Sequence, residues 1–438
     1  MIEDHLLLRY KFTIAFFCAI CWMLLSAYLG QPWFHSLILH FGEIPAVLII
    51  LFIALIPGFM NMFILVSFLF NKRNKKQHFD KYPNISILIP AYNESDSIYD
   101  TVSSVLAQRY QGKIQIIVID DGSTDDTLAK LTSLKENIVK LPNLTIIANP
   151  HRGKSFALNT GLKKVKYELL VTIDGDSHLL PNAIERIVAK YLSSASDTVA
   201  VSGGVYPINP DQNFMTRIQK WEYFLGIATI KSVQCFLQGT LVAQGAFSLF
   251  RTSFVELVGG WKDTVGEDIV LTWTMLKKGC RILHADDAIL LTKMPHTYKS
   301  FFLQRSRWSR GMIEAFRHNP QILKSWRLST FLVYWDLLFP FVDLAYCFIF
   351  IPGVIAAFFG YYAIAGLMTL AVLPIGILFT YVYVIKQKTL LKGCHLKVKM
   401  DFWSCIVYVL FYNMLMVPAC IHGYFSEFFN LKKKWGTK

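Results

Sequence analysis

Two segments near the start of the chain lack charged residues altogether. Phe12–Gly30 and Pro45–Phe70 contain no Asp, Glu, Lys or Arg, and each is long enough to cross a bilayer as a helix, which takes about 20 residues. The linker Gln31–Ile44 also lacks Lys and Arg, whereas residues 71–76 form a basic run. The positive-inside rule therefore predicts a short outer hairpin, with the N-terminus and the middle of the chain in the cytoplasm. With 54% hydrophobic residues, the composition argues against a simple soluble enzyme.

A basic leader is also missing from the start of the chain. A cleaved signal peptide is the alternative interpretation of the first apolar segment, but the chain opens with Glu3 and Asp4, and no clear small-x-small cleavage site follows. These features favour a retained membrane helix. Cys18 and Cys21 form a C-x-x-C inside this segment, where packing is a better interpretation than a zinc or redox site.

The C-terminal third is again apolar, and we expect about three spans in it. Residues 330–385 predict two spans with a turn near 353–362, Lys386–Lys399 predicts a basic cytoplasmic loop, and residues 402–429 predict a further span. Five spans would leave Lys432–Lys434 outside, against the positive-inside rule. A re-entrant last span, a miscounted span and a tolerated violation all stay open. The expected domains are residues 1–76, 77–328 and 329–438.

The formal net charge of +14 would suggest a nucleic-acid partner in a soluble protein. Here many of the basic residues flank apolar segments, so anionic lipid head groups explain them more simply. We therefore expect the lipid bilayer as a partner and no nucleic acid.

The middle of the chain alternates apolar runs with polar loops and helical stretches. The predicted strands are Ile85–Ile89, Ile114–Ile119, Leu144–Ala148 and Leu169–Ile173. Helices are expected to begin at Ser95, with Ser95 or Asp96 as the cap, at Asp125, and after Lys154 as far as about Val165. This alternation is typical of an α/β domain that has a mostly parallel sheet with helices on both faces.

Polar side chains follow the carboxyl ends of all four predicted strands. They are Asn93, Glu94, Asp120, Asp121, Arg152, Lys154, Asp174 and Asp176. In an open α/β sheet these strand ends line one crevice, where ligands bind. Gly175 lets the backbone turn sharply, so Asp174 and Asp176 can converge on a divalent ion, Mg²⁺ or Mn²⁺, that is bound to a phosphate. The pattern favours a nucleotide with a metal-bridged diphosphate.

Two other nucleotide-binding signatures are missing. Gly153-Lys154-Ser155 looks like the end of a P-loop, but that signature needs a glycine at position 148, where this chain has alanine. No G-x-G-x-x-G opens the first predicted helix. The first absence excludes an ATPase or a GTPase, and the second argues against a dinucleotide-dependent enzyme.

Two further motifs supply chemistry to the crevice. Gly266-Glu267-Asp268 precedes a predicted helix at Ile269–Lys278, and Gln304-Arg305-Ser306-Arg307-Trp308 lies on a predicted helix that leads to the membrane region. Alone, each has an ordinary interpretation, an acidic helix cap and a basic face next to the membrane. Together they offer what an inverting sugar transfer needs: a carboxylate as general base, cations for a leaving diphosphate, and an aromatic surface for the acceptor sugar.

These motifs, in this order, resemble the membrane-embedded family 2 glycosyltransferases, the group of cellulose, chitin, hyaluronan and poly-N-acetylglucosamine synthases, over about residues 83–317. The resemblance implies a GT-A domain flanked by transmembrane helices. It implies a nucleotide-sugar site of Ala91, Asn93, Glu94, Asp120, Asp121, Lys154 and Asp174, metal ligands Asp176 and Asp174, the general base Asp268, and an acceptor and diphosphate site of Glu267, Gln304, Arg307 and Trp308. Gly266 stands where the family pattern has a threonine. The Glu267-Asp268 pair is intact, so this difference affects only the fine positioning of the pair.

The function that this resemblance implies is processive, inverting polymerisation of a sugar from a UDP-sugar, with export across a bacterial inner membrane. Size and span arrangement look most like bacterial poly-β-1,6-N-acetylglucosamine synthases, with hyaluronan and chitin synthases as close rivals. N-acetylglucosamine is therefore the expected sugar, and a small membrane accessory subunit an expected partner. A single-addition transferase acting on a polyprenyl phosphate is the alternative. A nucleotide-sensing transporter or receptor is a third reading, which a base at Asp268 argues against.

Three other features stay open at this point. Residues 212–236, which include Trp221, form either an amphipathic helix on the membrane surface or a helix packed on the sheet. Residues 244–251 border the expected acceptor site. Asp336 and Asp343 lie seven apart, on one face of an apolar helix, and either line a polymer path or mark an interfacial helix.

Overall fold

A sheet of eight strands forms the middle of the chain and is covered by helices on both faces. The computed structural model describes residues 2–71, 78–137, 143–393 and 401–432, so the basic run at 72–76, Cys394, Lys433 and Lys434 lie outside the described residues. The strands are β1 (Ile85–Ala91), β2 (Ile114–Asp120), β3 (Leu144–Ala148), β4 (Leu169–Ile173), β5 (Ser177–Leu179), β6 (Thr198–Pro207), β7 (Phe247–Arg251) and β8 (Arg281–Thr292).

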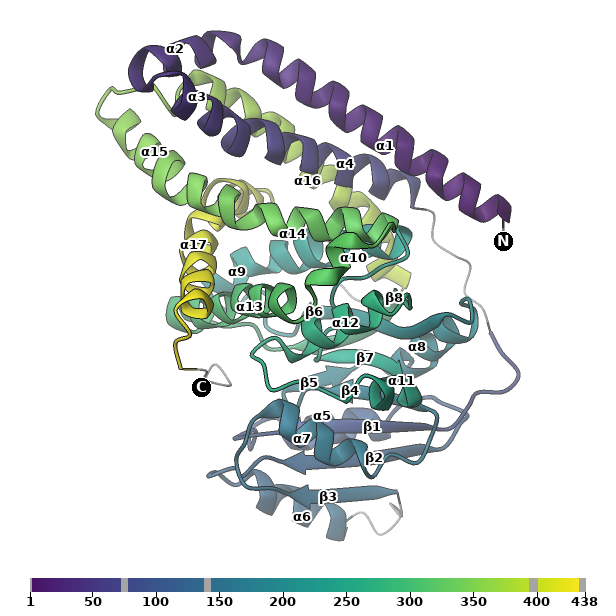
Figure 1. Ribbon diagram of the computed structural model, residues 1–438. Helices are drawn as coiled ribbons and strands as arrows, with labels where there is room; N and C mark the ends of the chain where they lie inside the picture. The colour runs from purple at the N-terminus through teal and green to yellow at the C-terminus, as the bar shows by residue number, and fades with distance from the viewer. Residues whose placement is uncertain (1, 72–77, 138–142, 394–400, 433–438) are drawn as a thin grey trace.

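The strand order is β3-β2-β1-β4-β7-β6-β8-β5. The pairs β1–β2, β2–β3, β1–β4 and β6–β8 are parallel, whereas β4–β7, β6–β7 and β5–β8 are antiparallel. The four predicted strands are thus adjacent and parallel, and their carboxyl ends share one edge. In Figure 1, β3 is the strand farthest from the long helices of the two chain ends.

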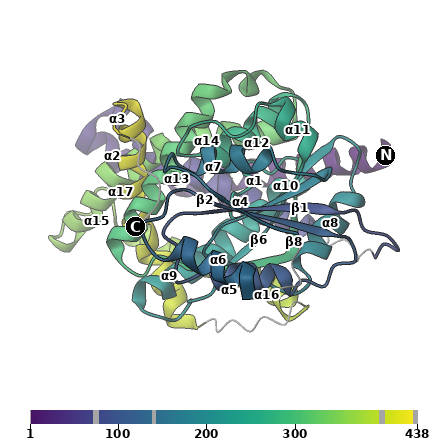
Figure 2. The ribbon, with the colours of Figure 1, turned by 90° about the horizontal axis from the view of Figure 1, so that it is seen from below.

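Two layers of helices cover the sheet because its central strands are apolar on both sides. The helices of the middle region are α5 (Ile98–Leu106), α6 (Thr127–Asn137), α7 (Lys154–Leu162), α8 (Ala183–Leu192), α9 (Phe214–Trp221), a π-helical turn η2 (Glu222–Ile227), α10 (Ala228–Phe236), α11 (Thr252–Leu257), α12 (Glu267–Lys277), α13 (Tyr298–His318) and the 3₁₀ turn η3 (Pro320–Lys324). Alternate residues of a strand face opposite sides: Ile87 joins the core under α5, α6 and α8, and Leu88 joins the core under α7, α11 and α12. Figure 2 shows α5 and α6 on one side of the strands, and α7, α11 and α12 on the other.

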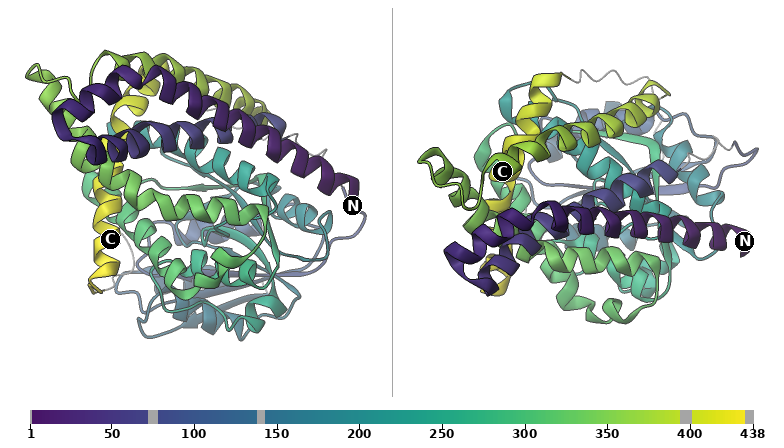
Figure 3. Two further views of the ribbon diagram at one scale, coloured as in Figure 1. Left: turned by 45° about the horizontal axis from the view of Figure 1, so that its top comes forward. Right: turned by 90° about the horizontal axis from the view of Figure 1, so that it is seen from above.

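The chain ends form long apolar helices above the sheet. They are α1 (Ile2–Leu29), α2 (Gln31–Phe41), α3 (Glu43–Ile50), the π-helical turn η1 (Leu51–Leu55), α4 (Ile56–Phe70), α14 (Leu328–Ala345), the π-helical turn η4 (Tyr346–Phe350), α15 (Ile351–Phe358), α16 (Leu367–Gly393) and α17 (Phe402–Phe428). Among the described residues, four helices are long and apolar enough to cross a membrane, namely Leu7–Leu29, Glu43–Phe70, Leu328–Phe358 and Phe402–Phe428. Figure 3 shows α1 and α4 packed along each other, where Phe12 meets Phe63 edge to face.

Several predicted boundaries of the apolar segments differ from the structure. The linker at 31–44 is largely the helix α2, and the turn between the first two C-terminal helices lies at 359–366. The predicted basic loop begins too early, because α16 continues to Gly393. Lys386 lies within that helix, where its Nζ donates to the carbonyl oxygen of Asn71 at 2.8 Å and lies 4.4 Å from the centre of the Phe68 ring. This lysine therefore ties α16 to the end of α4.

Two helices of the sheet domain also begin later than predicted. The amide of Ser95 donates to Asp125 Oδ2 at 3.1 Å, and that of Glu94 donates to Thr127 Oγ1 at 2.8 Å, so these residues form a loop and α5 begins at Ile98. Asp125 accepts from the amide of Thr127, where α6 begins. Burial opposes the effect, but these hydrogen bonds from Thr127 and Ser95 lower the pKa of Asp125 to about 2.

The segment 212–236 is a helix of the sheet domain that packs against α17. Trp221 is buried, and its indole Nε1 donates to Ser404 Oγ at 2.7 Å. The ammonium of Lys220, which is fully buried, lies 2.9 Å from Asp211 Oδ1 and 3.7 Å from Asp401 Oδ2. Phe224 and Ala228 pack against Tyr206 and Ile289 of the sheet, as the packed-helix alternative predicts, and the start of α17 is fastened to the sheet domain.

Candidate active site

The four loops that follow the parallel strands meet at one edge of the sheet. Ala91 at the end of β1 accepts a hydrogen bond from the amide of Asp121 at 2.8 Å, and Asp120 accepts one from the amide of Asn149 through its carbonyl oxygen at 2.8 Å. The turn after β4 is held from the β1 side, because Thr101 Oγ1 on α5 donates to the carbonyl oxygen of Gly175 at 2.9 Å. The residues predicted at strand ends therefore surround one region.

Asp120 and Asp121 differ sharply in their surroundings. Asp121 is fully buried, and it accepts hydrogen bonds from the amides of Arg152 at 3.2 Å and Gly153 at 2.8 Å. Burial raises the pKa of Asp121, although these bonds and the nearby His151 act in the opposite direction. Asp120 Oδ2 accepts from the amide of Ser123 at 3.2 Å, while its buried Oδ1 has no hydrogen-bond partner among the described residues. Asp121 thus braces the loop after β3, and Asp120 retains an acceptor for a ligand.

An aromatic stack that the sequence analysis missed lies beside this pair. The rings of Tyr92 and His151 are stacked with centroids 4.0 Å apart, and His151 Nδ1 lies 2.9 Å from Asp121 Oδ2. Both residues lie three positions past the end of a predicted strand, next to residues already selected, and that position is the signal that could have found them. Asn93, in the same loop, has a positive φ of 54° and accepts from the amide of Thr124 at 2.8 Å.

Lys154 lies between two carboxylates on separate elements. Its Nζ is 2.6 Å from Asp174 Oδ1 after β4 and 3.3 Å from Glu267 Oε1 on α12. Burial alone would lower the pKa of Lys154, but Asp174 and Glu267 hold it above its ordinary value. A Cβ added at Gly245 would lie 2.7 Å from this Nζ, so the lysine reaches close to the backbone at Gly245. The lysine and the two acids form one charged cluster, in which Glu267 is more than 90 residues from both Lys154 and Asp174 along the chain.

Glu267 and Asp268 occupy the first turn of α12, rather than the turn before it as predicted. Asp268 is half-buried, and its two oxygens are engaged separately: Oδ2 accepts from the amide of Gly245 at 3.0 Å, and Oδ1 from the amide of Ile269 at 2.8 Å. Both bonds fix the orientation of the carboxylate. Burial raises the pKa of Glu267 to about 7, with Lys154 acting against it.

A buried lysine on α10, which the sequence analysis did not single out as a site residue, also lies near Asp268. The Nζ of Lys231 donates to the carbonyl oxygen of Val242 at 2.5 Å. Burial lowers the pKa of Lys231 to about 8, while the negative charge of Asp268 acts to raise it. Because the residue is separated from every predicted motif, no local pattern marked it.

The helix α13 carries Gln304, Arg307 and Trp308 and touches the start of α12. A Cβ added at Gly266 would lie 2.5 Å from the Cα of Gly311, and the amide of Gly266 donates to Glu314 Oε2 at 2.9 Å. The replacement of the family's threonine by Gly266 thus permits a close contact between the two helices. Gln304 and Arg307 lie on the same face of α13 as Gly311, two turns and one turn earlier.

Trp308 is 42% exposed, and its ring is held from one side. The guanidinium of Arg305, which is 2% exposed, lies 4.1 Å from the ring centre and pairs with Glu222. The aromatic ring is therefore held by a buried cation and also open to solvent.

The candidate metal ligands supply oxygen chemistry alone. Asp174 and Asp176 are half-buried, and Asp176 Oδ1 accepts from Ser177 Oγ at 3.3 Å. In the parts of the chain that the structure describes, no group of three or more His, Cys, Asp or Glu side chains could hold a metal ion. Two carboxylates fit Mg²⁺, which often takes only one or two from the protein and the rest from phosphates and water.

Comparisons with known proteins agree with this geometry. A model of glycosyl transferase family 2 matches residues 86–259. The poly-beta-1,6-N-acetyl-D-glucosamine synthase of Staphylococcus aureus (strain MSSA476) is 32% identical over 271 residues, which is 59% of this chain and 64% of that protein. The synthase of the same name from Staphylococcus epidermidis is 29% identical over 298 residues, 65% and 71% of the two chains. The match thus spans less than two thirds of the length of the S. aureus relative.

A solved structure supports the fold over most of the chain. The mannosyltransferase of Pyrobaculum calidifontis, in complex with GDP-Man and Mn²⁺, has a TM-score of 0.59 at 17% identity and covers 88% of this chain and 99% of its own. At this identity the likeness shows the fold alone. The predicted GT-A fold, with its mostly parallel sheet and flanking apolar helices, is confirmed.

Proposed function

The chain carries a glycosyl transferase family 2 domain, and from this premise we propose that it is a membrane-embedded enzyme that polymerises N-acetylglucosamine from a UDP-sugar. The names of the relatives from two Staphylococcus species support a polysaccharide as product and N-acetylglucosamine as its unit. The apolar helices on both sides of the domain support a location in the bacterial inner membrane. We assign the catalytic domain to the cytoplasmic side, where the UDP-sugar is.

One observation carries the proposal: Asp268 is held by two backbone amides beside the cluster of Lys154, Asp174 and Glu267. In an inverting transfer, this carboxylate takes the proton from the attacking hydroxyl of the acceptor sugar as that oxygen bonds to the anomeric carbon. The bond from that carbon to the diphosphate breaks on the opposite face. Lys154, and Arg307 on α13, stabilise the negative charge of the leaving diphosphate.

The nucleotide end of the site is assigned to the loops after β1, β2 and β3. The free acceptor on Asp120, the backbone at Ala91 and Asn93, and the nearby Glu94 would hold the nucleoside. Asp121, predicted as a further contact, would act through the loop after β3 that it braces. The stacked rings of Tyr92 and His151 offer an aromatic surface next to it, which suits a nucleobase because every base has a π-face. These contacts fix the orientation of the donor.

Asp176 would be the direct ligand of a divalent cation, and Asp174 would support it. When bound, Mg²⁺ or Mn²⁺ neutralises charge on the diphosphate and so makes it a better leaving group. Lys154 now pairs with Asp174 at 2.6 Å. We expect this lysine to turn towards the diphosphate when the donor binds.

The acceptor end is assigned to Gln304, Arg307 and the exposed ring of Trp308. The flat ring suits the apolar face of a terminal sugar. Because Arg305 fixes the Trp308 ring, the ring would keep that sugar at a constant position relative to Asp268. A polymer made here would pass between the apolar helices, and a small membrane accessory subunit is an expected partner.

The test is donor consumption by the purified full-length chain in lipid nanodiscs. Radiolabelled UDP-N-acetylglucosamine, UDP-glucose and UDP-glucuronate are supplied with Mg²⁺ or Mn²⁺, and products are sized on a gel. We expect long polymer from UDP-N-acetylglucosamine. No turnover with any UDP-hexose would refute the proposal.

Product size also decides between the two enzyme classes. A single labelled sugar on a lipid would replace the polymerase by a single-addition transferase on a polyprenyl phosphate. The Q-x-x-R-W motif and the N-terminal apolar helices favour the polymerase. Mass analysis of the product then gives the sugar and the linkage.

A further inference from the structure

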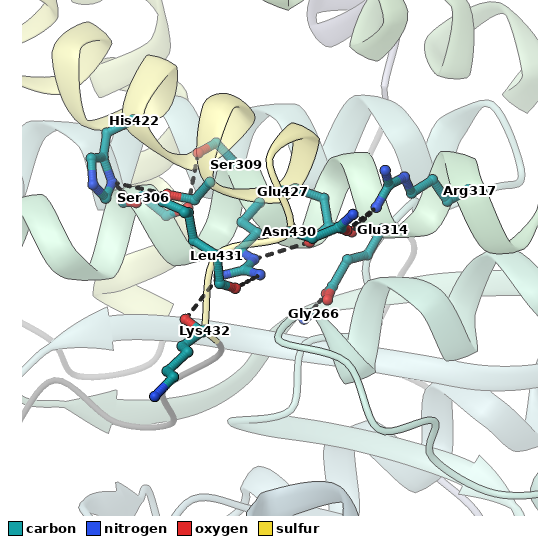
Figure 4. Close-up of polar contacts among 12 residues, drawn as sticks. Gly266, Ser306, Ser309, Glu314, Arg317, His422, Glu427, Asn430, Leu431 and Lys432 are labelled. Carbon is teal, nitrogen blue, oxygen red and sulfur yellow. Dashed lines mark hydrogen bonds and ion pairs between the residues drawn. The ribbon is translucent and has the colours of Figure 1, made fainter.

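The helix α13, which carries the proposed acceptor residues, contacts other helices through two of its faces. Gln304, Arg307, Gly311 and Glu314 fall on the face towards α12, and Gly311 and Glu314 both contact Gly266 there. Ser306, Ser309, Arg310 and Arg317 lie on a second face, and this one is covered by the C-terminal half of α17. Figure 4 shows the two helices side by side with their polar contacts.

The end of α17 holds this second face through one carboxylate. Glu427 is 4% exposed. Each of its two carboxylate oxygens binds a different arginine: Oε2 accepts from Arg310 Nε at 3.0 Å, and Oε1 accepts from Arg317 Nη1 at 2.6 Å. Arg310 also donates to the carbonyl oxygen of Leu431 at 2.6 Å, and Arg317 to Asn430 Oδ1 at 3.1 Å. The residues just past α17 thus complete the binding of both guanidinium groups (Figure 4).

Close backbone contact one turn earlier fixes the distance between the helices. A Cβ added at Gly423 would lie 2.0 Å from Ser309 Oγ and 2.2 Å from the carbonyl oxygen of Ser306. Ser309 Oγ donates to the carbonyl oxygen of Cys420 at 2.9 Å, and Ser306 Oγ lies 2.8 Å from His422 Nδ1. At this separation, α13 cannot rotate or slide without breaking the Glu427 pairs.

The contacts continue from α13 to the base. Glu314 accepts from the amide of Gly266 at 2.9 Å, and Gly266 directly precedes the turn that carries Glu267 and Asp268. A rotation of α13 would therefore move Arg307 and Trp308 and the start of α12 relative to each other. The nucleotide loops after β1, β2 and β3 have no part in these contacts.

We propose that Glu427 is a positioning residue for sugar transfer: it holds α13 against α12, so that the acceptor motif and Asp268 keep their mutual geometry. This inference rests on the proposed function and assigns a task to a helix that composition alone classes with the membrane spans. Glu427 acts through α13 and touches no substrate.

A carboxylate is required at this position because of the buried arginines. Arg310 has a side chain that is 8% exposed, so loss of its partner leaves a buried charge uncompensated, which is strongly unfavourable. Arg310 would then seek water, and α13 would turn with it. A misplacement of about 1 Å can cost roughly 10²-fold in rate.

The experiment compares Glu427→Gln and Glu427→Asp with the wild-type chain in nanodiscs. Initial rates of UDP release give kcat and the KM values for donor and acceptor oligosaccharide, and calorimetry gives the Kd of UDP with Mn²⁺. For Glu427→Gln we expect kcat to fall about 10- to 100-fold, with the Kd of UDP within about twofold of wild type. Glu427→Asp, which reaches one guanidinium, should recover part of the rate.

Two further variants separate positioning from general stability. Arg317→Gln removes the half-exposed partner alone and should lower kcat less than Glu427→Gln. The matched control is Asp401→Asn, which removes a carboxylate at the opposite end of α17 and should leave kcat within about twofold. A comparable loss in this control, or a parallel loss of UDP binding in Glu427→Gln, would reduce Glu427 to a structural role and overturn the inference.

The outcomes also separate this inference from the proposed function. A wild-type chain that consumes no UDP-sugar contradicts the proposed function. An active wild type, together with an equally active Glu427→Gln variant, contradicts the positioning role of Glu427 alone.

Discussion

Replacement of Asp268 by asparagine tests the proposed base with a minimal change of shape. The carboxylate accepts the amide of Gly245 at 3.0 Å on one oxygen and that of Ile269 at 2.8 Å on the other. Asparagine has a single acceptor oxygen, so one of these amides will face an NH₂ group. An unsatisfied donor costs about 1–3 kcal/mol. We therefore expect a modest loss of stability and a folded protein.

The rise in activation free energy for transfer should exceed this loss of folding stability. A general base contributes about 10²- to 10⁴-fold, which corresponds to about 2.7–5.4 kcal/mol of activation free energy. UDP affinity should be unchanged, because the two hydrogen bonds of Asp268 lead to Gly245 and Ile269 and not to the nucleotide loops. The assay is single-turnover transfer from radiolabelled UDP-N-acetylglucosamine, with calorimetric UDP binding on the same preparation.

The control is Asp263→Asn, the same chemical change at an exposed position five residues earlier. It should transfer sugar at the wild-type rate. A fully active Asp268→Asn variant would refute the assignment of the base. Loss of UDP binding in that variant would show instead that Asp268 holds the donor.

Three further outcomes follow from the structure. Gly266→Thr restores the residue of the family pattern but brings a Cβ to 2.5 Å from the Cα of Gly311. Overpacking of this kind costs about 1–3 kcal/mol, so the variant should melt at a lower temperature and transfer sugar more slowly. A melting curve and the initial rate of transfer measure the two effects. Lys231→Met should be more stable than wild type at pH 7, because burial lowers the pKa of Lys231 to about 8. Below pH 8 the folded state therefore carries the cost of a buried ammonium, and this cost fades as the pH rises from 8 to 10.5. Denaturant unfolding at pH 7 and pH 10 measures the difference in stability, and an equal gain at both pH values would contradict the reasoning. Removal of divalent cations with a chelator should abolish transfer without shifting the melting temperature of the UDP-free protein, and added Mn²⁺ should restore the rate.

The strands that hold the nucleotide loops were predictable because their signal is local. Apolar runs such as Ile85–Ile89 and Leu169–Ile173 are buried on both faces, and burial of both faces gives a nearly continuous apolar pattern, interrupted here by the buried Ser86 and Thr172. The far half of the sheet was not predicted, since β7 (Phe247–Arg251) enters antiparallel between β4 and β6. Such pairing depends on partners some 50 to 80 residues away, and no local period encodes it.

The candidate site was likewise predictable only where its residues follow a local pattern. Strand-end positions identified Asp120, Lys154 and Asp174 as neighbours, because parallel strands bring their carboxyl ends together. The insertion of Lys154 between Asp174 and Glu267 was not predicted, because it depends on how α12 packs over the sheet. The stack of Tyr92 on His151 was also not predicted, since it joins the loops after β1 and β3, which lie on either side of β2.

The contacts at both ends of α17 hold this helix against the sheet domain. Its first turn is tied to Lys220 and Trp221, and its last to Arg310 and Arg317, all four within the sheet domain. A helix of 27 residues is about 40 Å long, so it runs along the domain rather than away from it. Both ends of α17 are therefore anchored to the sheet domain, although the helix is long and apolar enough to cross a membrane. A displacement of α17 would strain the contacts at Lys220 and at Arg310 together.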